Sequence, residues 1–112
     1  MAALTNLLIE QGASFSSTVT LYNEDDTVFD LTGYTAASQI RKSYSSSSAS
    51  ATFTIAFSSD RTLGQITLSL TPTQTANLEE GRYVYDTEVT SSDSTVTRVL
   101  QGTVTVSPNV TR

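Results

Sequence analysis

The chain has 112 residues, a formal net charge of −5, and neither Cys nor His. These numbers exclude a disulfide framework, a thiolate nucleophile, a Ser-His-Asp triad and the common zinc sites. Only six residues are Lys or Arg, so we expect no nucleic-acid partner, because phosphate recognition needs a concentrated basic patch. The chain lacks a signal-peptide pattern and a long apolar run, so we also expect no export and no membrane partner.

The length predicts one domain over residues 1–112, and the abundance of Thr and Ser with few charges favours strands over helices. Residues 4–10 read as a first, edge strand. Apolar side chains at every second position predict half-buried strands over residues 15–21, 34–40, 51–57 and 66–70. Polar turns separate these stretches, and the Ser-rich run 45–50 predicts a flexible loop.

One short helix is expected after the strand 66–70. Thr71 can cap it, Pro72 suits its first position, and Gln74 completes a capping box. Gly81 is expected to end the helix within about two to three turns. The helix should carry the chain from one sheet to the other.

The stretch 78–90 organises the chain because it reads as a turn followed by a strand. Immunoglobulin-like sandwiches place a Tyr near the start of strand F, with its hydroxyl bonded back to the preceding corner. Gly81 and Tyr83 fit such a tyrosine corner, and Tyr85 stands where the core Cys of an immunoglobulin domain would be. We therefore predict a structural tyrosine corner in a sandwich that has no disulfide.

The last strand, residues 95–107, contains one conflict in its alternation. Val96, Leu100 and Gly102 share the predicted inward face, and Arg98 falls on that face as well. Either a bulge near Val99 re-registers the strand, or Arg98 lies where the core opens. With this strand the chain has seven to eight short strands and one helical turn. The pattern predicts an all-β, immunoglobulin-like antiparallel sandwich, with a small closed barrel as the alternative.

Paired carboxylates are the first candidates for chemistry. Asp86 and Glu88 alternate outward on one strand, which offers neither the cleft nor the apolar pocket of a glycosidase. We interpret them as a solvated face that pairs with Arg82 or Arg98 across strands. No other residue pattern indicates catalysis, so we expect no enzyme and no cofactor.

Two charged loops are the remaining candidates. The acidic cluster of residues 24–26 with Asp30 lacks the calcium-loop spacing, so we interpret it as a charged hairpin tip and expect no metal. Arg41, Lys42 and Tyr44 could contact a partner or a nucleic-acid backbone. Two basic residues are a weak signal, and a plain loop flank is the preferred interpretation.

Several stretches together carry a resemblance to a known class of proteins. They are residues 9–15, 30–36, 39–41, 64–68, 78–86 and 102–112. The chain resembles small structural proteins of tailed bacteriophages and is similar to the N-terminal module of phage baseplate upper proteins. In one departure from that pattern, Thr87 stands where an aliphatic residue would be expected.

The resemblance implies a non-enzymatic structural protein of the phage virion, made in the host cytoplasm and present in several copies of a symmetric assembly. It would dock on larger virion proteins, in the tail or baseplate, or alternatively on the outer capsid as a decoration protein. Its expected partner contacts are Pro108, Asn109, Val110, Thr111 and Arg112, beside the N-terminal residues 1–5.

A carbohydrate-binding module is the alternative from another class. It would use Tyr22, Tyr34 and Tyr44 as stacking surfaces, although Tyr34 fits the core pattern better.

Overall fold

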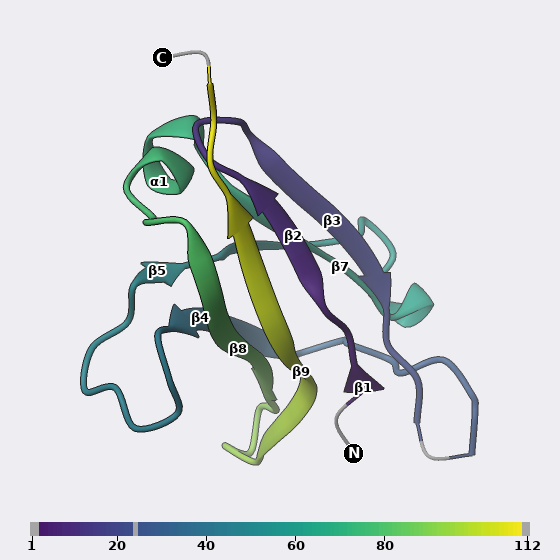
Figure 1. Ribbon diagram of the computed structural model, residues 1–112. Coiled ribbons are helices and arrows are strands. Elements are labelled where there is room, and N and C mark those ends of the chain that lie inside the picture. Colours follow the sequence, from purple (N-terminus) through teal and green to yellow (C-terminus); the bar gives the residue numbers. More distant parts are fainter. Residues whose placement is uncertain (1–2, 24, 111–112) are drawn as a thin grey trace.

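The protein is a sandwich of a larger and a smaller β-sheet (Figure 1) in a computed structural model that describes residues 3–23 and 25–110. The larger sheet has the order β1-β9-β8-β4-β5, and β2 pairs with β9 as well. Its strands are β1 (Ala3–Leu4), β2 (Leu7–Glu10), β4 (Thr35–Arg41), β5 (Ala51–Thr52), β8 (Gly81–Thr90) and β9 (Val96–Ser107). The smaller sheet has the order β3-β7-β6, from β3 (Phe15–Thr20), β6 (Thr54–Phe57) and β7 (Gln65–Leu70).

The predicted all-β sandwich is confirmed. β1 and β2 are two parts of one interrupted edge strand, which we call the edge run. β5 and β6 are likewise two parts of one stretch of chain, which pairs with the larger sheet before Phe53 and with the smaller sheet after it. The pairing departs from a purely antiparallel pattern at one place only among the described strands. There β1 and β2 run parallel to β9, because the chain crosses to the smaller sheet before it returns.

The core lies between the two sheets and follows the predicted alternation. β4 contributes Ile40 and β7 contributes Ile66 and Leu68, all with no exposed surface, and β9 contributes Val104. Each such side chain stabilises the fold by roughly 1.5–3 kcal/mol through removal of apolar surface from water.

The helix α1 (Pro72–Ala76) connects β7 to β8, and its predicted capping box is present. The Thr71 hydroxyl accepts from the Gln74 N–H, and the Gln74 side chain accepts from the Thr71 N–H. The prediction that Gly81 ends the helix is wrong. The helix ends at Ala76 with Asn77 as its C-cap, because the buried side chain of Leu78 draws the chain into the core, and Gly81 begins β8. No helix among the described residues is long and apolar enough to cross a membrane.

A β-bulge resolves the conflict at Arg98. Thr87 is paired with Leu100 and Glu88 with Arg98, so Val99 is the extra residue on β9. The bulge reverses which side chains face the core, so Arg98 points outward with Glu88. The prediction that Val96 faces the core is therefore wrong: it lies beyond the bulge and is 57% exposed.

At Gly102, the segment between β1 and β2 lies very close to the backbone of β9. A Cβ atom at this position would lie 2.1 Å from the Thr5 carbonyl oxygen, so only glycine fits here. The same oxygen accepts a hydrogen bond of 2.7 Å from the Tyr85 hydroxyl, and Tyr85 is the residue paired with Gly102. Gly102 and Tyr85 together fix the break between β1 and β2.

Candidate functional site

The outward face of the larger sheet carries a polar depression that we call the arginine depression. It has a volume of about 180 Å³. Its lining comes from β4, β8 and β9 and from the loop after β4: Gln39, Arg41, Tyr44, Val84, Tyr85, Asp86 and Arg98. Two stretches that are distant in the sequence, residues 39–44 and 84–98, therefore contribute to one concave surface.

Strand register decides which side chains reach this face. Gln39 is paired with Asp86 and Arg41 with Val84, and residues that oppose one another in a sheet point to the same side. Asp86 alternates with Tyr85, whose side chain is buried with only 2% exposed. Because side chains alternate along each strand, the residues between the buried apolar ones point outward, and here these residues are mostly polar.

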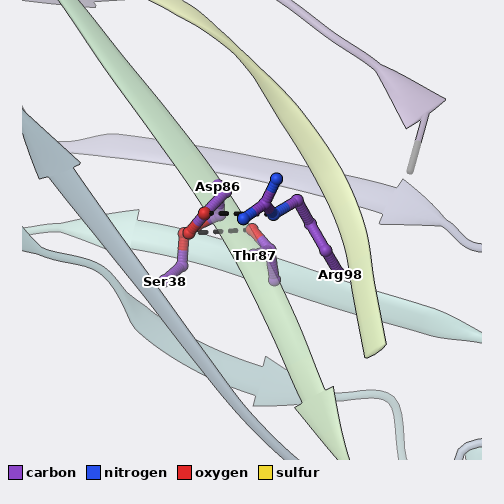
Figure 2. A network of polar contacts seen from close by, with 4 residues as sticks. All are labelled: Ser38, Asp86, Thr87 and Arg98. Carbon is purple, nitrogen blue, oxygen red and sulfur yellow. Dashed lines mark hydrogen bonds and ion pairs between the residues drawn. The ribbon is translucent and has the colours of Figure 1, made fainter. Parts of the chain in front are cut away.

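The two arginines of the depression are held in place by existing contacts. The Arg98 Nε atom lies 3.2 Å from the Asp86 Oδ2 atom, and Figure 2 shows the side chain extending from β9 toward Asp86 on β8. Arg41 donates to the Ser46 carbonyl oxygen and to the Gln39 side-chain oxygen. The interpretation of Asp86 as a solvated residue paired with Arg98 is confirmed.

A buried polar pair lies on the inward side of β4 and β8, next to Asp86 (Figure 2). Thr87 donates to the Ser38 hydroxyl at 3.0 Å, and Ser38 donates to the Asp86 carbonyl oxygen at 2.7 Å. Both side chains are almost completely buried, at 0% and 1% exposed. Thr87 therefore replaces the expected aliphatic residue at little cost, because each buried hydroxyl has a hydrogen-bond partner.

The residues predicted as a tyrosine corner lie on the inward side of β8. The Tyr83 hydroxyl donates to the Glu79 carbonyl oxygen at 2.8 Å, which ties the strand to the turn before it. Lys42 covers the Tyr83 ring with its amino group 4.4 Å from the ring centroid. Burial raises the pKa of the Tyr85 hydroxyl to about 12.

The C-terminal residues predicted as partner contacts follow β9. Within the described part of the chain, Val110 is 93% exposed, whereas the Asn109 N–H donates to the Gln11 side-chain oxygen at 3.4 Å. Pro108 lines a hollow together with residues 10–13. Thr111 and Arg112 lie outside the described residues.

The described acidic residues of the hairpin are held by local hydrogen bonds. Hydrogen bonds from Thr27 hold the pKa of the Asp25 carboxyl below its usual value, and those from Thr32 do the same for Asp30. Each carboxylate thus closes its own local turn. No group of three or more potential metal ligands occurs among the described residues, and Glu24 is not one of these.

The three tyrosines of the carbohydrate-binding alternative do not share a surface. Tyr22 forms a bridge with Val28 in the hairpin after β3, and Tyr34 packs against Phe29 with ring centroids 5.2 Å apart. Tyr44 lies in the loop between β4 and β5, on the opposite side of the molecule from the hairpin (Figure 1). A stacking platform built from these rings is therefore not present.

A search of solved structures finds similarity to CopC from Methylosinus trichosporium OB3b. The TM-score is 0.51 and the sequence identity 17%, over 95% of this chain and 89% of that chain. At this identity the likeness shows the sandwich fold alone. Comparison with protein-family models gives no match, and comparison with curated proteins gives none either.

The predicted role as a structural protein of a tailed-phage virion is wrong. A solved structure that shares the fold is CopC, which is not a phage protein, and neither family models nor curated proteins link the chain to phages. The resemblance rested on strand-and-turn patterns such as residues 64–68, a core strand, and residues 78–86, a corner. Sandwich geometry imposes such patterns on unrelated chains, so the capsid-decoration alternative is overturned with the tail and baseplate role.

Sequence reasoning noticed most residues of the arginine depression but did not bring them together. Arg41 and Tyr44 were interpreted as a loop flank, and Asp86 with Arg98 as a separate pair. Gln39 carried no signal of its own. Only the pairing of β4 with β8, and the bulge that turns Arg98 outward, place them side by side.

Proposed function

We propose that this chain is a non-catalytic binding module that holds a carboxylate-bearing segment of a protein partner in the arginine depression. The observation that carries the proposal is the convergence of Arg41 and Arg98 on one concave surface of a protein whose net charge is −5. A free carboxylate is the natural ligand of such a pair, since guanidinium groups bind carboxylates through two parallel hydrogen bonds.

The existing contacts of the two arginines favour binding because they fix the side chains without using all the donors. A guanidinium group has five N–H donors. Arg41 uses donors of two nitrogens for Ser46 and Gln39, and Arg98 uses its Nε for Asp86. Less rotamer entropy is then lost when a ligand is bound.

The size of the depression limits the ligand to a side chain or a chain terminus. Its volume of about 180 Å³ is below the roughly 300–1,000 Å³ of pockets that enclose a drug-sized molecule. Tyr44, which is 76% exposed, can cover the apolar part of a bound side chain. The net negative charge disfavours a polyanion such as nucleic acid, whose many phosphates would be repelled.

Catalysis is not supported by this site. A general acid or base needs a desolvated group, whereas the Asp86 side chain is 37% exposed and already paired with Arg98. The chain also has no His or Cys to act as a base or nucleophile.

Titration followed by NMR tests the proposal. The probe is a capped peptide of alternating Gly and Glu, and the matching Gly–Gln peptide is the uncharged reference. We expect the Glu peptide alone to shift the amide signals of β4, β8 and β9. Arg41→Gln or Arg98→Gln should weaken binding about tenfold or more, since hydrogen bonds to charged groups are worth roughly 1.5–3 kcal/mol.

Arg82→Gln is the matched control, because Arg82 is exposed on β8 but does not line the depression. It should change the dissociation constant less than about twofold, as expected for a peripheral charge. Equal weakening in all three variants, or equal binding of the Glu and Gln peptides, would overturn the proposal.

A further inference from the structure

The edge strand β3 of the smaller sheet has a free side. β3 pairs with β7 over its whole length, from Phe15 with Leu70 to Thr20 with Gln65, without a register shift. Within residues 3–23 and 25–110, no strand pairs with its other side. Such an edge presents a row of unpaired backbone N–H and C=O groups to solvent.

β3 lacks the features with which proteins protect edge strands. Charged residues, Pro, bulges and short length normally prevent pairing with another chain, and none of these occurs in residues 15–20. The other edges differ. The edge run beside β9 is broken between Leu4 and Leu7 and carries Glu10, β5 has two residues, and β6 has four.

We infer that the free edge of β3 pairs antiparallel with β3 of a second copy of this chain, which joins two smaller sheets into one of six strands. This inference does not depend on the proposed function, because it uses none of the residues of the arginine depression. A second copy fits because the edge is uncharged in a molecule of net charge −5, so it is a surface on which two copies meet without like charges opposed.

The alternation of β3 restricts the register of such a pair. Residues directly opposite one another must point to the same side of the sheet, so only registers that oppose residues of equal parity are allowed. Among these registers we propose the one with Thr18 opposite Thr18 of the partner and Ser16 opposite Thr20. All three are small hydroxyl residues, and hydroxyl pairs across strands are stabilising. The Thr18 and Thr67 hydroxyls already form such a pair at 2.9 Å on this face.

An exposed apolar side chain beside β3 supports the same contact. Leu8 on β2 is 60% exposed and lines a hollow of about 280 Å³ with Phe15 and Ser16. β2 and β3 run next to each other along one side of the sandwich (Figure 1). A second copy at the β3 edge would therefore also remove Leu8 from water. Glu10 is the one ionisable residue in the lining of this hollow.

The expected dimer is weak and reversible. The five residues 16–20 that this register pairs in each copy bury less than the roughly 1,000 Å² of total surface that a stable interface needs. The dissociation constant should therefore lie between about 0.1 and 1 mM. Sedimentation of the full chain from about 10 μM to 1 mM should show a monomer that becomes a dimer. Added salt should strengthen association, since it screens the repulsion between two acidic molecules.

Single-cysteine variants test the register, because the natural chain has no Cys. Thr18→Cys should form an intermolecular disulfide under mild oxidation, since directly opposed residues have Cα atoms within about 5.5 Å. Thr67→Cys is the matched control on the same face. Its Cα atoms would be about 14 Å apart in the dimer, three strand spacings, and should not cross-link.

Proline variants separate loss of pairing from loss of folding. N–H groups alternate between the two sides of a strand, so of Ser16→Pro and Ser17→Pro one removes a solvent-facing donor and the other a donor to β7. The variant that removes the solvent-facing donor should stay folded and sediment as a monomer at 1 mM. The inference is overturned if the natural chain is monomeric at 1 mM or if Thr67→Cys cross-links as fast as Thr18→Cys.

Discussion

The two sides of β8 have different roles, although their residues alternate along a single strand. The inward residues Tyr83, Tyr85 and Thr87 are at most 4% exposed, and each hydroxyl has a specific partner. The outward residues Asp86 and Glu88 are more exposed and face arginine on β9. The inward side therefore sets the stability of the fold, whereas the outward side is free to determine what the protein binds.

The largest expected effect comes from the inward residue of β9 that opposes Tyr85. Gly102→Ala would place a Cβ atom 2.1 Å from the Thr5 carbonyl oxygen, a backbone atom that cannot rotate away. We expect a loss of about 3 kcal/mol in the free energy of unfolding, at the upper end of the cost of overpacking. Urea denaturation measures it, with the outward neighbour Thr103→Ala as control. A loss below about 1 kcal/mol would show that the edge run moves aside freely.

A smaller effect is expected for the hydroxyl of Tyr85. Tyr85→Phe removes the hydrogen bond to Thr5 and should cost about 1 kcal/mol near pH 7. The pH dependence is a sharper test. The folded state holds the hydroxyl proton up to a pKa of about 12, against the ordinary tyrosine value of 10.0, so the unfolded chain loses its proton first. This contribution to stability is complete below pH 10 and is lost as the pH rises from 10 to 12.

Stability of the natural chain and of Tyr85→Phe, measured between pH 8 and 12, should therefore converge at high pH. The expected convergence is about 1 kcal/mol, which is the advantage of the natural chain near pH 7, and the two curves cross if the natural chain loses more than that. Tyr83→Phe is the control, since it removes the bond to Glu79 and keeps the Tyr85 hydroxyl. Parallel curves for the natural chain and Tyr85→Phe would contradict the burial of that hydroxyl.

The smallest effect on stability is expected on the outward side. Arg98→Gln breaks the ion pair with Asp86, and both side chains are more than a third exposed. Pairs of this kind contribute at most about 1 kcal/mol, so we expect a loss below about 0.5 kcal/mol by thermal denaturation. The same variant should weaken peptide binding strongly, and a large loss of stability instead would remove the contrast between the two sides of the strand.

The comparison also explains which predictions from the sequence succeeded. The alternation in residues 51–57 and 66–70 and the capping box at Thr71 were correct, because each depends on neighbours within a few residues. The end of the helix was predicted incorrectly because the burial of Leu78, a tertiary contact, ends it before Gly81. Val96 was placed on the wrong side because the alternation gives no sign of which residue forms the bulge.

The sequence by itself determined the strands, the helix start and the absence of disulfide, thiol and histidine chemistry. These follow from residue types and from the period of two that a pleated strand imposes. Only the tertiary structure decided that Val99 is the bulged residue, that Gly102 makes room for Thr5, and that Arg41 and Arg98 line one depression. Strand order and register bring residues together from distant parts of the chain, and local patterns cannot encode that pairing.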